Sequence, residues 1–362
     1  MRARRPGNIF RGMSMSLALD KPLPEALPPP PGGLALGSLD HGDPAAIAAA
    51  DHAARHWTWP ESGRLRPGTA AHKRAAAAMF RETFNPYKPS IIQWPQLDPA
   101  AQERLTGLPI WDIAVQTEGK ARLRMLAYAQ ALADRDWQAA IEQNGWEEWR
   151  HKVVLSDLVR SYGIGLEPEP PYRNPRDAEW AYLVTGFSEC VDSFFAFGLF
   201  ELAKRSGYFP IALVDTFEPV IQEEARHILL FANWLAAHRA GLSLPRRLWF
   251  ECRVLAVWAF LGWERIGFAR GMDNDKAGDK AGGKAGGKPQ DNNFTLNGSA
   301  AVSDVDVSVP ELMAICLTEN DRRFAGYDAR LLRPTTTPAL ARLAIRLSGL
   351  FRRRRRAAPR PA

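Results

Sequence analysis

Cysteine is scarce in this chain of 362 residues, and its three copies form no paired motif. Cys190, Cys252 and Cys316 lie far apart, which is typical of a reducing compartment, so we expect a cytoplasmic protein. The sequence also lacks a G-x-G-x-x-G fingerprint and a cysteine cluster, which excludes a recognisable nucleotide, flavin or iron–sulfur site. Redox chemistry in this protein would therefore need electrons from another protein.

A net positive charge is absent from the body of the chain, although the net charge of the whole chain is +7. Residues 1–12 and 352–362 together hold ten arginines and no acids, so residues 13–351 carry 7 − 10 = −3. We expect no nucleic-acid partner, because a phosphate backbone is bound by a basic surface. The arginine run 352–356 ends an amphipathic stretch, which is either a solubilising end or a peripheral contact with anionic lipid.

A secretory signal is also missing, because no continuous apolar region precedes Pro22. A proline run follows, and we expect residues 1–44 to form a disordered arm. Met1, Met13 and Met15 are alternative translation starts.

The hydrophobic pattern is helical, and it predicts an all-α fold. Residues 45–109 are expected to form alanine-rich helices at 45–56 and 69–83. A strap follows at 84–109, where the prolines forbid a long helix. Residues 110–270 are then expected to form a helix bundle.

Five long helices are expected in that bundle region, at 110–133, 137–162, 177–205, from about 208 to 238 with a kink or restart at Pro219, and at 245–270. Charged residues interrupt the fifth helix, so we expect it to pack on the bundle and not to span a membrane. Residues 271–300 indicate a flexible Lys/Gly-rich linker. Residues 301–362 indicate further helices, near 309–331 and 337–351, with a basic tail.

The connection from Ile164 to Arg176 is unusual because it contains four prolines in thirteen residues. At full extension it reaches roughly 40 Å, which is the length of the flanking helices. Such a connection predicts a long crossover between the second and third helices of a bundle.

A five-residue phrase occurs twice, at 147–151 (EEWRH) and 223–227 (EEARH). Residues three apart share one helix face, so Glu148 with His151, and Glu224 with His227, can each offer a carboxylate and an imidazole to one point. Histidine is rare, with only three copies after residue 100, and two of them lie in this phrase. This repetition predicts metal binding.

Two further acids fit the same layer. Metal-binding helix bundles take one carboxylate from each of the other two helices at the same height. Glu118 precedes Glu148 by 30 residues and Glu189 precedes Glu224 by 35, with a helix break near the middle of each interval. In antiparallel helices, equal distances from the turn place these acids at equal heights.

Two acids near these positions have alternative roles. Gly119 weakens the helix beside Glu118, so Asp112 is the alternative ligand. Asp192, three residues after Glu189, either lies beside the ligands or pairs with an arginine.

This arrangement resembles the ferritin-like di-iron carboxylate proteins. The acid before each metal-binding Glu and the Arg before each His are similar to the oxygen-activating branch, including acyl-carrier desaturases and bacterial multicomponent monooxygenases. The resemblance covers roughly residues 110–240. It implies a four-helix bundle, two iron ions with manganese as an alternative, and O2 as co-substrate. The implied ligands are Glu118, Glu148, His151, Glu189, Glu224 and His227.

Around these ligands we expect supporting contacts from Glu147, Arg150, Asp192, Glu223 and Arg226. Glu147 and Glu223 would each accept the outer N–H of a metal-bound imidazole, unless both are solvated acids beside an arginine. An aromatic shell is expected to exclude water and to favour an apolar substrate, and its members would be Phe194, Phe195, Phe197, Phe231 and Trp234.

Together these patterns predict an oxygenase or oxidase that hydroxylates or desaturates an apolar or acyl-type compound, with electrons from a ferredoxin or reductase. A ferritin-like protein that stores or oxidises iron is the main alternative. A scaffold whose buried acids pair only with Arg150 and Arg226 is a third. His52 and His56 are expected to be solvated, because no acids accompany them at metal-binding spacing.

Overall fold

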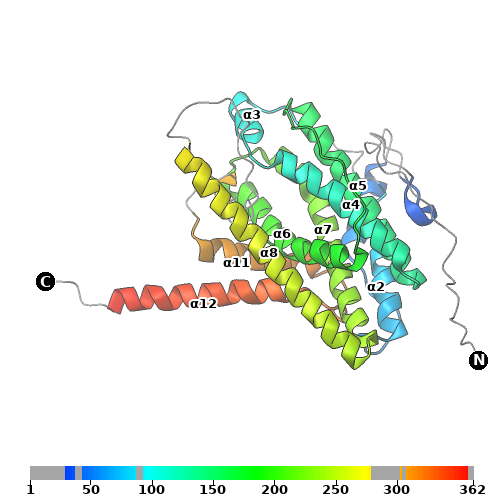
Figure 1. Cartoon of the computed structure of the whole chain (residues 1–362). Helices are drawn as coiled ribbons and strands as arrows, with labels where there is room; N and C mark the ends of the chain where they lie inside the picture. Colours follow the sequence, from blue (N-terminus) through cyan, green and yellow to red (C-terminus); the bar gives the residue numbers. More distant parts are fainter. Residues whose placement is uncertain (1–28, 37–42, 87–92, 279–301, 304–306, 358–362) are drawn as a thin grey trace, which may run out of the picture.

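The computed structural model describes residues 29–36, 43–86, 93–278, 302–303 and 307–357 (Figure 1). Within these ranges the secondary structure is helical, and the only β-type pairing is an isolated bridge between Trp57 and Tyr327. The predicted all-α class is confirmed.

Four long helices form the centre of the protein: α4 (Trp111–Ala131), α5 (Arg135–Ser161), α6 (Ala178–Ser206) and α7 (Ile211–Gly241). α4 packs against α5 and α6, and α7 also packs against α5 and α6, so the four close into a ring (Figure 1). Their apolar faces provide much of the buried core. Pro219 lies inside α7, which is continuous past it.

Local sequence signals set the ends of these helices. The side chain of Asp134 accepts hydrogen bonds from the backbone N–H groups of residues 136 and 137 and so begins α5. Asp177 caps α6 in the same way. At the other end of α6, Gly207 has a φ of 65°, a left-handed conformation that glycine adopts without a steric penalty.

The proline-rich connection between α5 and α6 follows the length of α4. The backbone N–H of Glu167 donates a 2.7 Å hydrogen bond to Asp112 near the start of α4. Tyr172 then packs on Gly119, and the residues that follow lie beside Arg124. The connection therefore runs along about 18 Å of α4, because a helix rises 1.5 Å per residue.

The N-terminal elements are η1 (Pro31–Gly33), α1 (Pro44–Arg55), α2 (Ala70–Glu82) and α3 (Pro99–Thr106). α2 packs against both α5 and α7. The expected strap contains only the short α3, and its residues 87–92 lie outside the described chain. Most of the expected arm, residues 1–28 and 37–42, also lies outside it.

The C-terminal elements are α8 (Leu244–Gly278), α11 (Val309–Phe324) and α12 (Thr336–Ala357), and all three pack against α6. α8 extends eight residues into the expected linker, where residues such as Lys276 and Ala277 are good helix formers. Residues 279–301 lie outside the described chain. α11 ends at Phe324, earlier than expected, because the backbone of Gly326 packs against Arg55 and accepts a hydrogen bond from Trp57.

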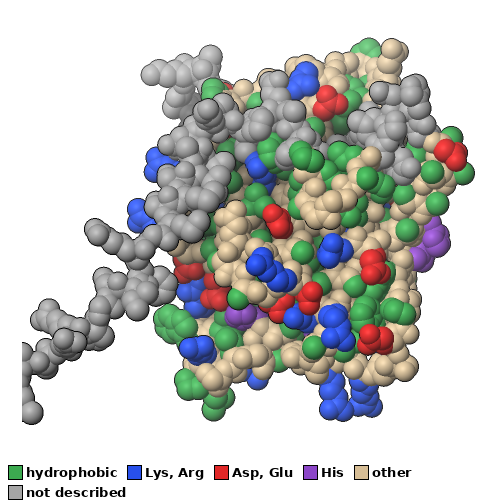
Figure 2. Space-filling model, turned by 90° about the vertical axis from the view of Figure 1, so that its right-hand side faces the viewer, with side chains coloured by type: hydrophobic (Ala, Val, Ile, Leu, Met, Phe, Trp, Pro, Cys, Tyr) green, Lys and Arg blue, Asp and Glu red, His purple; other side chains and the backbone are tan. Residues whose placement is uncertain are grey.

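Of the described helices, only α6 is long and apolar enough to cross a membrane, and 67% of its apolar window is buried inside the protein. It contacts α4, α7, α8, α11 and α12, which explains why it is apolar on most sides. This is the pattern of a core helix. On the face shown in Figure 2, acidic and basic side chains are interspersed, with no large basic patch.

Candidate metal centre

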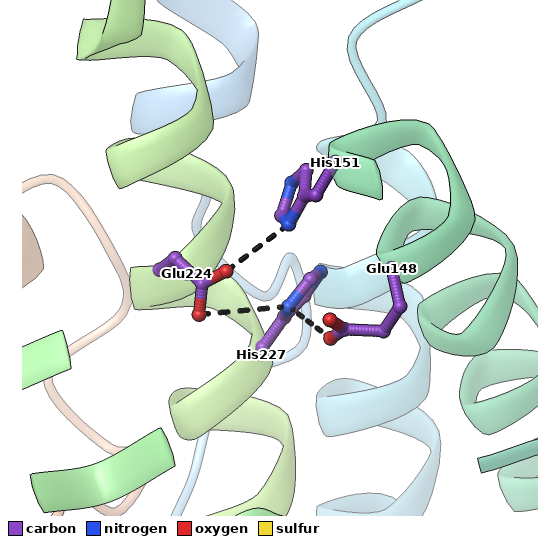
Figure 3. Close-up of side chains that lie close together, drawn as sticks. All are labelled: Glu148, His151, Glu224 and His227. Carbon is purple, nitrogen blue, oxygen red and sulfur yellow. Dashed lines mark ion pairs between the residues drawn. The ribbon is translucent and has the colours of Figure 1, made fainter. Parts of the chain in front are cut away.

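The two repeated phrases meet at the centre of the protein. Glu148 and His151 on α5, and Glu224 and His227 on α7, each offer one ligand atom, and these four atoms lie within 4.8 Å of one another (Figure 3). Each imidazole faces the carboxylate of the opposite helix: His151 Nδ1 lies 3.1 Å from Glu224, and His227 Nδ1 lies 2.8 Å from Glu148. The Glu-x-x-His spacing on two facing helices produces this arrangement.

Several polar atoms that face this centre make no well-formed hydrogen bond among the described residues, although each imidazole Nδ1 has a carboxylate oxygen of the opposite helix within 3.1 Å. They are Nδ1 of both imidazoles, Oε1 of Glu148, and both carboxylate oxygens of Glu189. Buried polar groups are normally satisfied, and leaving one unsatisfied costs roughly 1–3 kcal/mol. Because all of these atoms are oxygen or imidazole nitrogen, they fit iron or manganese, and no cysteine contributes.

Glu118 on α4 and Glu189 on α6 complete the layer from the other two helices. Glu118 Oε2 lies 3.9 Å from His151 Nδ1, and both acids line the same cavity as the cluster. Burial, together with the charges of Glu148 and Glu224, raises the pKa of Glu118 and of Glu189 well above the usual value. Burial and the neighbouring carboxylates therefore oppose the ionisation of these two acids.

The outer nitrogens of the imidazoles are held by acids from the opposite helix. His151 Nε2 donates to Glu223 on α7 at 2.9 Å, and His227 Nε2 donates to Glu147 on α5 at 3.0 Å. These crossed hydrogen bonds leave both Nδ1 atoms facing the centre. The alternative interpretation was that both acids are solvated. Both are almost fully buried, which contradicts it.

Buried arginines neutralise these two acids. Arg226 Nη1 donates to Glu147 at 2.8 Å, and Arg150 Nη2 donates to Glu223. Burial opposes the ionisation of Glu147, but the charge of Arg226 and the hydrogen bond from His227 hold its pKa below the usual range. Each phrase therefore supplies both an acid and a cation to support the other phrase.

Contacts from α2 and its C-terminal turn hold these arginines, and residue spacing does not predict these contacts. Arg226 Nε donates to Thr83 Oγ1 at 2.8 Å, and another of its nitrogens donates to the backbone carbonyl of Phe80. Arg150 Nη1 donates to the carbonyl of Asn85 at 2.9 Å. The last carbonyls of a helix lack partners within it, so this end of α2 is a natural acceptor for arginine.

The remaining candidate residues have different surroundings. Asp192 accepts a 2.8 Å hydrogen bond from Ser188, one turn earlier in α6, and lines the cavity. Asp112 anchors the connection through Glu167. One supporting residue was not expected: Ser193 donates to Glu224 at 3.2 Å.

The histidines outside the phrases lie elsewhere. His52 and His56 stack on each other with ring centroids 4.0 Å apart on exposed α1. His72 is buried and bonds Asn233 at 2.9 Å. His238, near the end of α7, lies 3.4 Å from Glu179.

A cavity of about 510 Å³ opens on the cluster. Apart from the acids and His151, its wall is mostly apolar, and its aromatic members are Trp111, Phe200, Phe209, Phe217 and Phe260. The aromatic residues expected at this wall do not line it; they are buried in the surrounding core: Phe194, Phe195, Phe197, Phe231 and Trp234. The apolar surroundings were expected, but the residues that form them were not.

A comparison with known proteins adds no relative: no family model matches the chain, and no curated protein or solved structure matches it significantly.

Proposed function

We propose that this protein is a ferritin-like di-iron carboxylate enzyme that uses O2 to hydroxylate or desaturate an apolar or acyl-type substrate. One observation carries the proposal. A cluster of carboxylates and imidazoles, with unsatisfied atoms facing inward, opens directly on an apolar cavity of about 510 Å³. Such a volume is within the usual range for organic ligands.

The helix arrangement supports the assignment to ferritin-like bundles. α4 and α6 carry one acid each, and α5 and α7 carry the Glu-x-x-His pairs, which is the distribution in di-iron carboxylate bundles. The path of the α5–α6 connection along α4 suits the long crossover of that fold.

The charge of the ligand set favours two divalent ions. Four ionised carboxylates and two neutral imidazoles carry a charge of about −4, which two divalent ions neutralise and one ion does not. The residues that hold the imidazoles add no net charge, because Glu147 is paired with Arg226 and Glu223 is paired with Arg150.

Bound ferrous ions would supply electrons to O2, and the same ligands would also accept manganese. The protein residues orient and protect this chemistry. Glu147 and Glu223 hold the two imidazoles, and the apolar wall keeps water away from the substrate. A separate reductase or ferredoxin would reduce the iron again after each turnover. Such partners would be present in the cytoplasm.

Metal analysis tests the proposal directly. We expect two iron ions per chain in the purified protein, and we expect His151→Ala and Glu224→Ala to lose tight binding with helical content retained. Glu142→Ala, on the exposed face of α5, is the matched control and should keep both ions. Unchanged metal content in both ligand variants would refute the assignment.

Iron turnover separates an enzyme from a storage protein. We expect ferrous iron beyond two per chain not to be oxidised catalytically, because the cavity wall is mostly apolar and offers few further ligands for iron. Reduced protein exposed to O2 should form an oxidised organic product only when an apolar compound is present. Oxidation of tens of irons per chain, with a mineral forming, would establish storage as the function.

A further inference from the structure

A second cavity, of about 480 Å³, lies beside the one that opens on the metal centre. Four residues line both cavities: Lys120 and Arg124 on α4, Val184 on α6, and Phe260 on α8. The two spaces therefore share one wall, and this wall carries two cations.

The second cavity is rich in positive charge. Besides Lys120 and Arg124 it is lined by Arg173 and Arg176, from the connection before α6. None of these four cations is in an ion pair among the described residues. The acid in this cavity, Asp177, is already paired with Arg253 at 2.9 Å.

Arg124 lies at the junction of the two cavities and is half-buried. It donates a 3.3 Å hydrogen bond to Thr185 on α6. Burial lowers its pKa, although the charges of Glu264 and Glu189 act in the opposite direction. A cation held in the wall that the two cavities share, with donors to spare, is a binding group for an anion.

The apolar cavity extends away from these shared cations along α4. Along α4 its wall runs from Trp111 to Arg124, which is about 20 Å at 1.5 Å per residue. Glu118 lies near the middle, roughly 9 Å from Arg124 along the helix. At the far end the wall is apolar, with Leu105, Phe209 and Val302.

We propose that the substrate is a long-chain amphiphilic anion, with its carboxylate or phosphate headgroup at Lys120, Arg124, Arg173 and Arg176 and its apolar chain in the cavity beside the metal centre. This inference rests on the proposed function for the identity of the site. The middle of the chain then lies opposite Glu118, so oxidation occurs within the chain and not at its free end.

Binding to the full-length protein as purified, under nitrogen, tests the headgroup without any oxidation. The probes are dodecanoate and dodecan-1-ol, which share a chain and differ in charge, and calorimetry gives both affinities. Dodecanoate should bind about tenfold more tightly than the alcohol, the effect of one charge-assisted hydrogen bond. Arg124→Gln should reduce this preference and leave the affinity for the alcohol within about twofold.

Two further variants locate the ligand. Ala114→Phe fills the apolar cavity and should weaken both probes, whereas Arg64→Gln, an exposed arginine that lines neither cavity, should change neither. Thermal melting checks that each variant is folded. Equal affinities for the two probes, or unchanged dodecanoate binding in Arg124→Gln or Ala114→Phe, would overturn the inference.

The result is separable from the proposed function, because binding is measured without turnover. Dodecanoate binding with the expected charge preference supports the amphiphile site even if the protein lacks iron. Metal analysis detects a lack of iron separately, and that result would count against the proposed function. Dodecyl phosphate, used as a third probe, distinguishes a phosphate headgroup from a carboxylate.

Discussion

Glu147 determines how His227 presents its nitrogen to the metal centre. The acid accepts from His227 Nε2 and from Arg226, and it also accepts from Gln143 at 3.0 Å. We expect Glu147→Gln to lower metal affinity about tenfold or more, because such supporting acids typically contribute 10–100-fold. Metal titration followed by absorption measures the loss, and Glu142→Gln is the control. Wild-type affinity would contradict the role.

Glu218 provides a pH-dependent contribution to stability away from the metal centre. Arg323 binds both of its oxygens, at 2.7 and 2.8 Å, and Lys204 and Arg55 lie within 3.3 Å. Burial opposes ionisation, but the hydrogen bonds and charge of Arg323, with the other two cations, lower the pKa of Glu218 to about 2. A lowered carboxyl pKa stabilises the folded state above the unfolded pKa of about 4.3 and stops doing so as pH falls through 2.

Glu218→Gln should therefore lower the free energy of unfolding by roughly 1–3 kcal/mol at pH 7. The difference from wild type should shrink as pH falls from about 4 toward 2, where Glu218 becomes protonated as well. Urea unfolding at several pH values measures this. A difference that stays constant across pH would contradict the assigned pKa.

Gly119 allows the connection before α6 to lie on α4. A Cβ at this position would stand 2.6 Å from the ring of Tyr172, whose hydroxyl also accepts from Lys152 at 3.2 Å. We expect Gly119→Ala to destabilise the protein by roughly 1–3 kcal/mol, despite its better helix propensity, because Tyr172 must move. Thermal melting of Gly119→Ala and Gly119→Ala/Tyr172→Ala tests this, and the second change should restore part of the loss.

At the residue level, the sequence predicts side chains whose roles follow from spacing within one helix. Glu148 and His151 are of this kind, because three residues separate ligands on one face. Arg124 and Thr83 are not of this kind. The role of Arg124 depends on its tertiary contacts with α8 and the connection, and the role of Thr83 depends on its contact with α7. Gly119 was interpreted as a weak point in a helix, because its tertiary neighbour cannot be read from the sequence.

Among the elements, the helices with strong caps were predicted closely. Asp134 and Asp177 mark the starts of α5 and α6, and Gly207 marks the end of α6. The end of α11 was predicted too late, because a tertiary contact at Gly326 stops the helix where its own sequence would allow it to continue. Local propensity yields to such contacts.

α12 carries an exposed apolar stripe that continues into the arginine run of the sequence. Leu340, Leu343 and Leu347 are 56, 50 and 45% exposed, and Arg342 and Arg346 lie beside them. This amphipathic pattern suits the surface of an anionic membrane. We expect the protein to sediment with phosphatidylglycerol vesicles and not with phosphatidylcholine vesicles, because each surface arginine contributes about 1 kcal/mol.

Leu343→Gln combined with Leu347→Gln should reduce that sedimentation, whereas Leu248→Gln, an exposed leucine on α8, should leave it unchanged. Equal sedimentation with both vesicle types would contradict a preference of α12 for anionic lipid.

At the scale of the whole molecule, the cavity is assembled from segments far apart in the sequence. Its wall draws on α3, α4, α5, α6, α7, α8 and Val302. The shared height of the candidate residues could be predicted from the distances between helix breaks, because bundle geometry links sequence distance to height. The cavity wall could not, since it depends on how α8 and the C-terminal segment cover the four helices.

The crossed hydrogen bonds between α5 and α7 are related by an approximate two-fold symmetry, because each repeated phrase supports the other in the same way. The neighbouring helices break this symmetry. On α6, Ser193 lies four residues after Glu189 and donates to Glu224. On α4, the residue four after Glu118 is Arg122, and its guanidinium lies 3.3 Å from the centre of the Trp149 ring. The two metal positions of the proposed site are consequently inequivalent, and we expect a ferrous titration to fill them in two steps of different affinity.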